Sequence, residues 1–329
     1  MKKFINYFML ALIIPAFILT SCKDKTDPTP AVKGNFETLA NYMTANGMDL
    51  PALLDGWVIA PLMKADGGIV EADYSIPDYN VFDIRSEADF NAGHIKGAIN
   101  VPLKDIVTKA KELGTDKPYL VVCKTGQTAG RGTMALRLSG FSAKVMKFGM
   151  SYWNAQFDAW TPNIGDNALD SPNWVSDASA TMPVNDFPAW ETTSTDGAEI
   201  LAAKVDAMLA ADGWGVGSDG ILADPAAYKI YNFWTSDDYT AFGHFSGAYQ
   251  FKPISLENDL VAALPNSGDC YIYCFTGQTS SYITAWLQVL GYNAKSILFG
   301  VNKLQHTALD AASKPAWHHS YDYEFVTEN

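Results

Sequence analysis

The stretch that decides the fold reads YLVVCKTGQTAGR and runs from Tyr119 to Arg131. Four strand-forming residues lead directly into Cys123, a short loop of small residues follows, and a helical run, Met134–Leu138, ends at Gly140. This order predicts a strand, a loop and a helix. The sulfur of Cys123 then lies at the carboxyl end of the strand, where open α/β sheets bind their ligands.

The loop after Cys123 favours a reactive cysteine. A loop that curls over a helix N-terminus directs backbone N–H groups inward, and these groups favour an anion. The thiolate of Cys123 should therefore be stabilised and its pKa lowered. A buried, inert cysteine at a strand end is the alternative, but the glycine-rich loop argues for a nucleophile.

The same pattern occurs a second time, as DCYIYCFTGQTSS from Asp269 to Ser281. Matching segments flank both copies in the same order, and from Tyr79 onward their offsets drift only from 149 to 151 residues. The sequence therefore contains an internal duplication. The matched flanks are Asp55–Trp57 with Asp212–Trp214, Tyr79–Arg85 with Tyr228–Trp234, Gly93–Ala98 with Gly243–Ala248, and Phe148–Gly149 with Phe299–Gly300.

Each half alternates strands with helices. This alternation predicts an α/β fold in which a mostly parallel sheet is flanked by helices, once in each half. Ser86 is the expected N-cap of one helix, and Asp196 with Glu199 is the expected capping pair of another. The predicted boundaries are a signal peptide 1–21, a tether 22–35, a first domain 36–160, a connector 161–195, a second domain 196–316 and a tail 317–329. The connector holds three large aromatics, so we expect it to pack across the domains rather than to form a free linker.

The amino-terminal segment has the features of a bacterial lipoprotein leader. Lys2 and Lys3 precede an apolar run, and the residues Leu19-Thr-Ser-Cys22 resemble a lipobox, in which the cysteine is lipidated. An uncleaved anchor is the alternative, although ~16 apolar residues are short for a span of about 20. We therefore expect a protein of the cell envelope that is anchored only by lipid on Cys22 and faces the periplasm or the exterior.

Charge and cysteine usage exclude several classes of protein. A net charge of −13 and only three arginines leave no basic patch for nucleic acid. Cys270 and Cys274 lie about 13 Å apart on a regular strand, too far for a disulfide. Cys270 is therefore expected to be a core residue. No cysteine or histidine cluster predicts a metal site, and no cofactor is expected. The oligomeric state is left open.

In combination these motifs resemble those of the tandem rhodanese-like sulfurtransferases. Asp83-Ile-Arg85, Phe90 and Gly93–Ala98 look like that family's amino-terminal signature, and Cys123–Ala129 is similar to its active-site loop. With the repeat counted, the resemblance extends from Phe36 to Gln305. It implies two rhodanese-like domains that move a sulfane sulfur from an anionic donor such as thiosulfate to a thiol or cyanide, through a cysteine persulfide.

The resemblance also implies the roles of individual residues. Cys123 is the expected nucleophile, Cys274 is the expected second catalytic cysteine, and Lys124 is a candidate for attracting the donor. Arg131 could assist, but a surface position on the helix is an equally good reading. Asp83, Arg85, His94 and His244 are expected to be structural. The residues expected to bind substrate are Lys124, Thr125, Gly126, Gln127 and Thr128 in the first loop, and Phe275, Thr276, Gly277, Gln278 and Thr279 in the second.

The second copy departs from the pattern. Asn232 and Trp234 replace the Asp and Arg of the signature, and Phe275 replaces the lysine after the cysteine. Its loop lacks a cationic side chain, which weakens the case for an anionic donor there.

Two other functions stay open. The protein could be a persulfide carrier or ligand-binding lipoprotein without catalytic turnover. A phosphatase or arsenate reductase on a related fold would need an arginine six residues after the cysteine, where Ala129 and Ser280 stand. Arg131 comes two positions too late.

Overall fold

The computed structural model describes residues 35–257 and 260–327. The expected signal peptide, the Cys22 lipid site and nearly all of the tether lie outside the described residues. Within the described residues, no helix combines the length and the apolar character that a membrane crossing requires.

The first half contains a five-stranded parallel sheet with the strand order β1-β5-β4-β2-β3. Its strands are β1 (Val58–Ile59), β2 (Asn80–Asp83), β3 (Ile99–Asn100), β4 (Tyr119–Val122) and β5 (Ala143–Met146). Its helices are α1 (Asn35–Ala45), α2 (Leu50–Leu53), α3 (Glu87–Ala92), α4 (Ile106–Leu113), α5 (Gln127–Leu138) and α6 (Met150–Trp153).

The second half contains another five-stranded parallel sheet, with the order β10-β8-β11-β12-β7. When each strand is replaced by its sequence equivalent, this order is the same as that of the first sheet. Its strands are β7 (Gly215–Val216), β8 (Ile230–Asn232), β10 (Tyr249–Gln250), β11 (Asp269–Tyr273) and β12 (Asn293–Ile297). Its helices are α7 (Gly197–Ala210), α8 (Asp219–Ala223), α9 (Ser236–Phe242), α10 (Gln278–Val289) and α11 (His306–Ala311). The predicted α/β class is confirmed, and the duplicated motifs lie at equivalent places in both sheets.

The remaining elements are short. The strands β6 (Trp174–Val175) and β9 (His244–Phe245) pair antiparallel. The 3-10 turns are η1 (Lys64–Asp66), η2 (Leu103–Asp105), η3 (Ala155–Phe157), η4 (Thr161–Asn163), η5 (Pro225–Ala227), η6 (Leu260–Ala263) and η7 (Gly300–Asn302). β6 belongs to the predicted connector, which therefore packs onto the second half at this strand. The connector's Phe187 also stacks on Phe36 of α1, with ring centroids 4.3 Å apart.

Strand β4 is buried on both faces, as expected of a central strand in a parallel sheet. Tyr119 and Val121 face the largest apolar cluster, which also contains residues of the second half. Leu120 and Val122 face a second cluster that includes Trp153 of α6 and Tyr323 of the tail. The alternation follows from the two-residue period of a strand and places the end of β4 between two packed layers.

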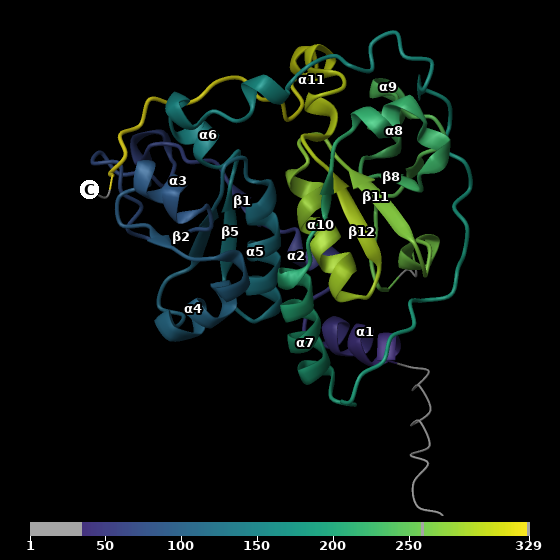
Figure 1. Cartoon of the computed structure of the whole chain (residues 1–329), viewed down its shortest axis with the longest axis horizontal. Helices are drawn as coiled ribbons and strands as arrows, with labels where there is room; N and C mark the ends of the chain where they lie inside the picture. Colours follow the sequence, from purple (N-terminus) through teal and green to yellow (C-terminus); the bar gives the residue numbers. More distant parts are fainter. Residues whose placement is uncertain (1–34, 258–259, 328–329) are drawn as a thin grey trace, which may run out of the picture. The chain divides into compact units, whose positions relative to one another are not determined.

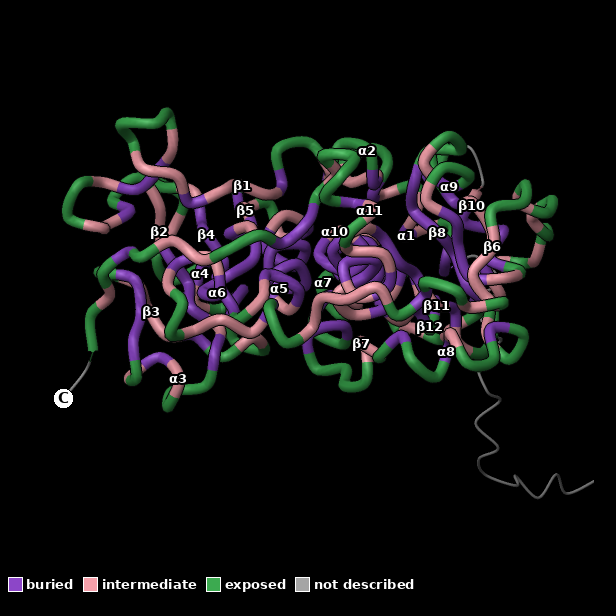
Figure 2. Tube along the Cα trace, turned by 90° about the horizontal axis from the view of Figure 1, so that it is seen from above, coloured by how far each residue is buried: buried purple, intermediate pink, exposed green. Residues whose placement is uncertain are grey.

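Helices α5 and α10 pack against each other where the two halves meet (Figure 1). A Cβ at Gly130 would lie 3.2 Å from the backbone nitrogen of Tyr282, so the two helices approach closely at this glycine. Figure 2 shows that both helices are buried along most of their length. Helix α5 starts at Gln127, seven residues before the predicted helical run, so it begins inside the cysteine loop.

The helix caps expected from the sequence are present. The Ser86 side chain accepts a hydrogen bond from the Asp89 N–H, and the Asp196 side chain accepts from the N–H groups of Ala198 and Glu199. These local interactions begin α3 and α7 at the predicted residues.

The tail returns to the first half, which its sequence did not predict (Figure 1). The Trp153 Nε1–H donates to the Glu324 carbonyl at 2.9 Å, and His94 and Val326 form an antiparallel bridge. The tail therefore covers the α6 side of the first sheet.

Candidate functional site

The sulfur of Cys123 lies in a cradle of backbone N–H groups at the end of β4. The N–H of Gly126 donates to Cys123 Sγ at 3.1 Å, and the N–H of Ala129 donates at 3.3 Å. The residues of the first loop that are expected to bind substrate end at Thr128, so Ala129 extends the cradle by one residue. Gly126 adopts a φ of +79°, which turns the loop so that these groups point at one atom.

The expected low pKa of Cys123 is wrong for this structure. Only 5% of the residue is exposed, and burial raises the pKa of its thiol above the ordinary value. The N–H groups of Ala129, Thr125 and Gly126 oppose this shift without overcoming it, and the Asp83 carboxylate adds to it. Desolvation penalises a thiolate more than these hydrogen bonds favour it. The neutral thiol is therefore the main form of the resting protein at neutral pH.

The turn that follows β5, at Phe148 and Gly149, lies against the backbone carbonyls of the Cys123 loop. The Met150 N–H donates to the Cys123 carbonyl at 2.8 Å, and the Ser151 N–H donates to the Lys124 carbonyl at 3.0 Å. With these carbonyls held outward, the N–H groups of the loop are free to face the sulfur. A Cβ at Gly149 would lie 2.3 Å from the Cys123 carbonyl oxygen, so only glycine fits in this turn.

We therefore expect Gly149→Ala to lower the free energy of unfolding by more than Gly140→Ala does. Both glycines have positive φ, +61° and +87°, and that strain alone costs about 1–3 kcal/mol for alanine. Only Gly149 adds a backbone clash, because a Cβ at Gly140 meets no atom within 4 Å. Urea unfolding of both variants measures the difference. Equal losses would show that the turn does not press on the cysteine loop.

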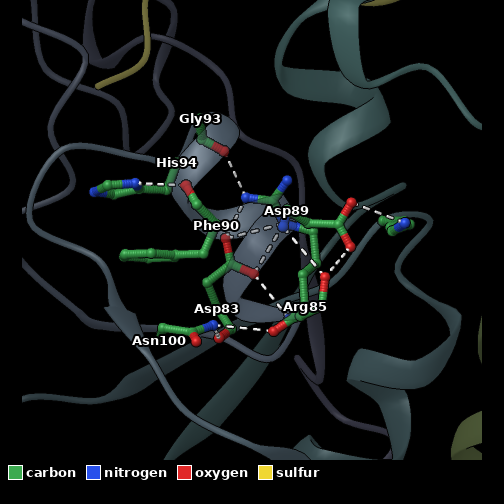
Figure 3. A network of polar contacts seen from close by, with 9 residues as sticks. Asp83, Arg85, Asp89, Phe90, Gly93, His94 and Asn100 are labelled. Carbon is green, nitrogen blue, oxygen red and sulfur yellow. Dashed lines mark hydrogen bonds and ion pairs between the residues drawn. The ribbon is translucent and has the colours of Figure 1, made fainter. Parts of the chain in front are cut away.

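A buried polar network supports the adjoining turn (Figure 3). The Arg85 Nη2 group pairs with the Asp83 carboxylate at 2.6 Å and donates to the Gly93 carbonyl, also at 2.6 Å. Asn100 Nδ2 donates to the carbonyls of Asp83 and Arg85. His94 stacks on Phe90 and hydrogen-bonds its carbonyl. The network connects β2, β3 and the end of α3, so Asp83, Arg85 and His94 have the expected structural role.

Lys124 lies at the solvent side of the first loop. Its Nζ pairs with the Asp89 carboxylate at 3.0 Å, and 57% of its side chain is exposed. It is therefore a cation beside the cysteine whose charge is partly balanced by α3. The other predicted loop residues differ in their contacts. Thr125 Oγ1 accepts a hydrogen bond from Gln127 Nε2 at 3.1 Å. The side chain of Thr128 is half-buried.

The second loop repeats the cradle with a different wall. The Ser280 N–H donates to Cys274 Sγ at 3.3 Å, and the Ser280 hydroxyl lies 3.6 Å from it. Phe275 stacks on Trp234, with centroids 4.5 Å apart, where the first half has the cations Lys124 and Arg85. The wall is apolar because Trp234 and Phe275 replace Arg85 and Lys124.

A cation does approach the second loop, from a part of the chain that the sequence did not single out. Lys314 Nζ lies 5.8 Å from the centre of the Phe275 ring and pairs with Asp238 of α9 at 2.6 Å. Asp238 is the repeat equivalent of Asp89, which pairs with Lys124. The second half thus retains the acidic residue at the position of Asp89, but its lysine partner, Lys314, follows α11 instead of the cysteine. The sequence around Cys274 could not reveal this change.

The glutamines of the two loops reach across to the opposite half. Gln278 Oε1 accepts the Phe148 N–H at 3.0 Å, and Gln127 Oε1 accepts the Phe299 N–H at 2.8 Å. Phe148 and Phe299 have left-handed backbones, with φ of +60° and +61°. Each Phe-Gly turn supports the cysteine loop of its own half, so each loop depends on a glutamine from the other loop.

The same exchange explains two glycines of the predicted site. A Cβ at Gly126 would lie 2.6 Å from Gln278 Oε1, and one at Gly277 would lie 2.4 Å from Gln127 Oε1. The two glycines leave room for the crossing side chains. Thr276 Oγ1 accepts the Gln278 N–H at 3.3 Å, and Thr279 is half-buried beside it.

An aromatic cluster that the sequence did not predict joins the two turns. Trp160 contacts both Phe148 and Phe299, with centroids 4.9 and 5.1 Å apart, and its Nε1–H donates to the Thr125 carbonyl at 3.1 Å. Trp317 of the tail also packs on Phe148. These residues are far apart in the sequence, so no local pattern indicated the cluster.

Arg131 is not a surface residue. It is fully buried on α5, its Nη1–H donates to Gln288 Oε1 at 2.8 Å, and its guanidinium lies 5.1 Å from the Trp214 ring centre. Burial lowers the pKa of Arg131 to about 10. The side chain therefore joins the two halves and points away from Cys123. Cys270 is a buried core residue, as expected, and burial raises the pKa of its thiol to about 12.

Comparisons with known proteins identify the region around Cys123. Residues 69–156 match the family model of the rhodanese-like domain. The chain is 32% identical over 80 residues to the uncharacterized protein YqhL of Bacillus subtilis, covering 24% of this chain and 64% of YqhL. It is 26% identical over 87 residues to the "Putative sulfurtransferase YtwF" of the same organism, covering 26% of this chain and 82% of YtwF.

A solved structure, that of a rhodanese-related protein from Thermoplasma volcanium, is 29% identical. The match covers 23% of this chain and 75% of that one, with a TM-score of 0.22. The chain thus spans less than two thirds of YqhL, and each of these matches covers about a quarter of the chain. The match to the family model extends over residues 69–156, which enclose Cys123 and its cradle, so the protein contains a rhodanese-like domain.

Proposed function

We propose that the protein is a sulfurtransferase that uses Cys123 to move a sulfane sulfur from an anionic donor such as thiosulfate to a thiol or cyanide. The observation that carries the proposal is the convergence of the Gly126 and Ala129 N–H groups on Cys123 Sγ, within the region that matches the rhodanese-like family model. The name given to YtwF supports the same chemistry.

The reaction has two halves. The Cys123 thiol releases its proton to solvent, and the thiolate attacks the outer sulfur of thiosulfate. A sulfur–sulfur bond forms to Cys123 while the bond inside thiosulfate breaks, and its electron pair leaves with sulfite. An acceptor thiolate or cyanide then attacks the outer sulfur of the persulfide, and Cys123 departs as a thiolate. The cradle stabilises the negative sulfur in both halves.

The surroundings of Cys123 support an anionic donor. Lys124 presents an exposed ammonium group beside the loop, and the donor competes with Asp89 for it. Because the lysine is solvent-exposed, salt screens its attraction for the donor.

We further propose that residues 196–316 form a second rhodanese-like domain, with Cys274 as a second sulfur-accepting site. The identical strand order and the Ser280 N–H on Cys274 Sγ support this assignment. The Phe275–Trp234 wall supports weaker reaction with thiosulfate than at Cys123.

Persulfide carriage without turnover is a second candidate function. One observation favours it: Cys123 is buried, and burial raises the pKa of its thiol. Little thiolate is then present, and because the thiolate is the nucleophile, repeated turnover would be slow. A phosphatase function is disfavoured because Arg131 donates to Gln288 and is turned away from the sulfur.

The proposed function is tested by incubating the protein with thiosulfate and mapping its peptides by mass spectrometry. We expect a gain of one sulfur atom on Cys123, removed again by cyanide with the release of thiocyanate. Persulfide that forms but is never passed to cyanide, dithiothreitol or glutathione would favour the carrier. No sulfur on either loop cysteine would contradict the proposal.

We also propose that Cys22 carries the lipid that holds the protein to the cell envelope, as its lipobox-like setting indicates. Cells fed a labelled fatty acid should label the protein, and Cys22→Ala should lose the label. A labelled Cys22→Ala variant would contradict the anchor.

A further inference from the structure

A pocket of about 270 Å³ opens where the carboxyl end of the first sheet faces the loop of Cys274. The pocket is lined by Trp57 and the residues of β1, by Pro315, and by three residues of the second loop, Thr276, Gln278 and Thr279. Lys147, which follows β5, also lines it. The pocket is therefore built from both halves of the chain.

Lys147 is a cation without an anionic partner in this pocket. No ion pair between described residues includes Lys147, and its Nζ lies 5.1 Å from the centre of the Phe148 ring. Burial lowers the pKa of its ammonium group. Desolvation of a half-buried ammonium group costs free energy, and here no ion pair offsets that cost. A bound anion would supply the missing ionic contact.

A second polar group of the pocket also lacks a partner. Gln278 is 3% exposed, and its Nε2 group has no hydrogen-bond partner among the described residues. Its Oε1 atom is held by the Phe148 N–H, which fixes the orientation of the amide. In the other loop the equivalent Gln127 Nε2 donates to Thr125. A buried N–H group left unpaired costs about 1–3 kcal/mol, so an acceptor at Gln278 relieves that cost.

The second half does not repeat the lysine of this pocket. Leu298 is the repeat equivalent of Lys147, and its side chain packs over Gly215, where a Cβ would lie 2.8 Å from it. The equivalent space near the loop of Cys123 is thus occupied by an apolar side chain. Both halves share the same fold, so the fold alone does not account for a lysine at this position in one half and a leucine in the other.

We propose that this pocket binds a small organic monoanion, a carboxylate or sulfonate with an apolar body. Its charged end lies against Lys147 and Gln278, at the positive N-terminus of α10, and its apolar part lies against Trp57 and Pro315. One unpaired cation matches one negative charge. The binding requires no sulfur chemistry, so it holds independently of the proposed sulfurtransferase activity.

Calorimetric titration of the whole protein with benzoate and with benzenesulfonate tests the proposal. We expect at least one of them to bind, and Lys147→Met to weaken binding tenfold or more. Lys144→Met is the matched control, because Lys144 lies on β5, the strand directly before Lys147, but does not line the pocket; this variant should bind as the unaltered protein does. Neutral benzamide should not compete.

A measurement on the unaltered protein covers the case in which Lys147→Met does not fold. Reductive methylation mapped by mass spectrometry should modify Lys147 several-fold more slowly in the presence of the bound anion, with no change at Lys144. Failure of both anions to bind, equal binding by Lys147→Met, or equal protection of the two lysines would overturn the proposal.

Discussion

Replacing Cys123 with serine is expected to lower thiosulfate-to-cyanide sulfur transfer by about 10³-fold or more, because a serine hydroxyl cannot form the persulfide. Such a loss corresponds to at least about 4 kcal/mol of transition-state stabilisation. The hydrogen bonds that Gly126 and Ala129 donate to the sulfur have room for the smaller oxygen, so the fold should be kept. Initial rates of thiocyanate formation measure the effect, and circular dichroism checks the fold.

Two matched variants distinguish the roles of the other cysteines. Cys274→Ser should leave the rate of transfer nearly unchanged, because the loss expected in Cys123→Ser leaves the second loop only a very small share of the transfer. Cys270→Ser should leave the transfer rate per folded molecule unchanged, since Cys270 is a buried core residue. Full activity of Cys123→Ser, or its loss in Cys274→Ser alone, would move the main site to the second half.

Replacing either loop glutamine with methionine is expected to disturb the cysteine of the opposite half. Gln278→Met leaves the buried Phe148 N–H without its acceptor, which costs about 1–3 kcal/mol of stability. The Phe148–Gly149 turn then holds the Cys123 loop less firmly. We expect iodoacetamide to alkylate Cys123 about fivefold faster or more, the factor that corresponds to 1 kcal/mol of easier local opening.

The reciprocal variant provides the control. Gln127→Met removes the acceptor of the Phe299 N–H, so it should speed alkylation of Cys274 more than that of Cys123. Peptide mapping after timed alkylation gives both rates in one sample, and urea unfolding gives the stability. If each variant affected only the cysteine of its own loop, the exchange of glutamines would have no part in positioning the sulfur.

The sequence by itself predicted the local architecture around both cysteines. Tyr119–Val122 forms the strand before Cys123, Ser86 and Asp196 cap their helices, and the cradle contains Gly126 as expected. These features depend on side-chain alternation, on capping groups and on glycine at positive φ, all of which act within a few residues. The repeated order of the duplicated motifs also predicted two equivalent sheets.

Only the tertiary structure decided how strongly each group is buried and which half it contacts. The pKa of Cys123 is raised because the packed layers desolvate it, although the loop alone favoured a lowered value. Arg131 is buried because α7 and α10 cover it. Gln127 and Gln278 hold turns more than 125 residues away. Such contacts depend on how the two halves pack, and a local pattern carries no information about that packing.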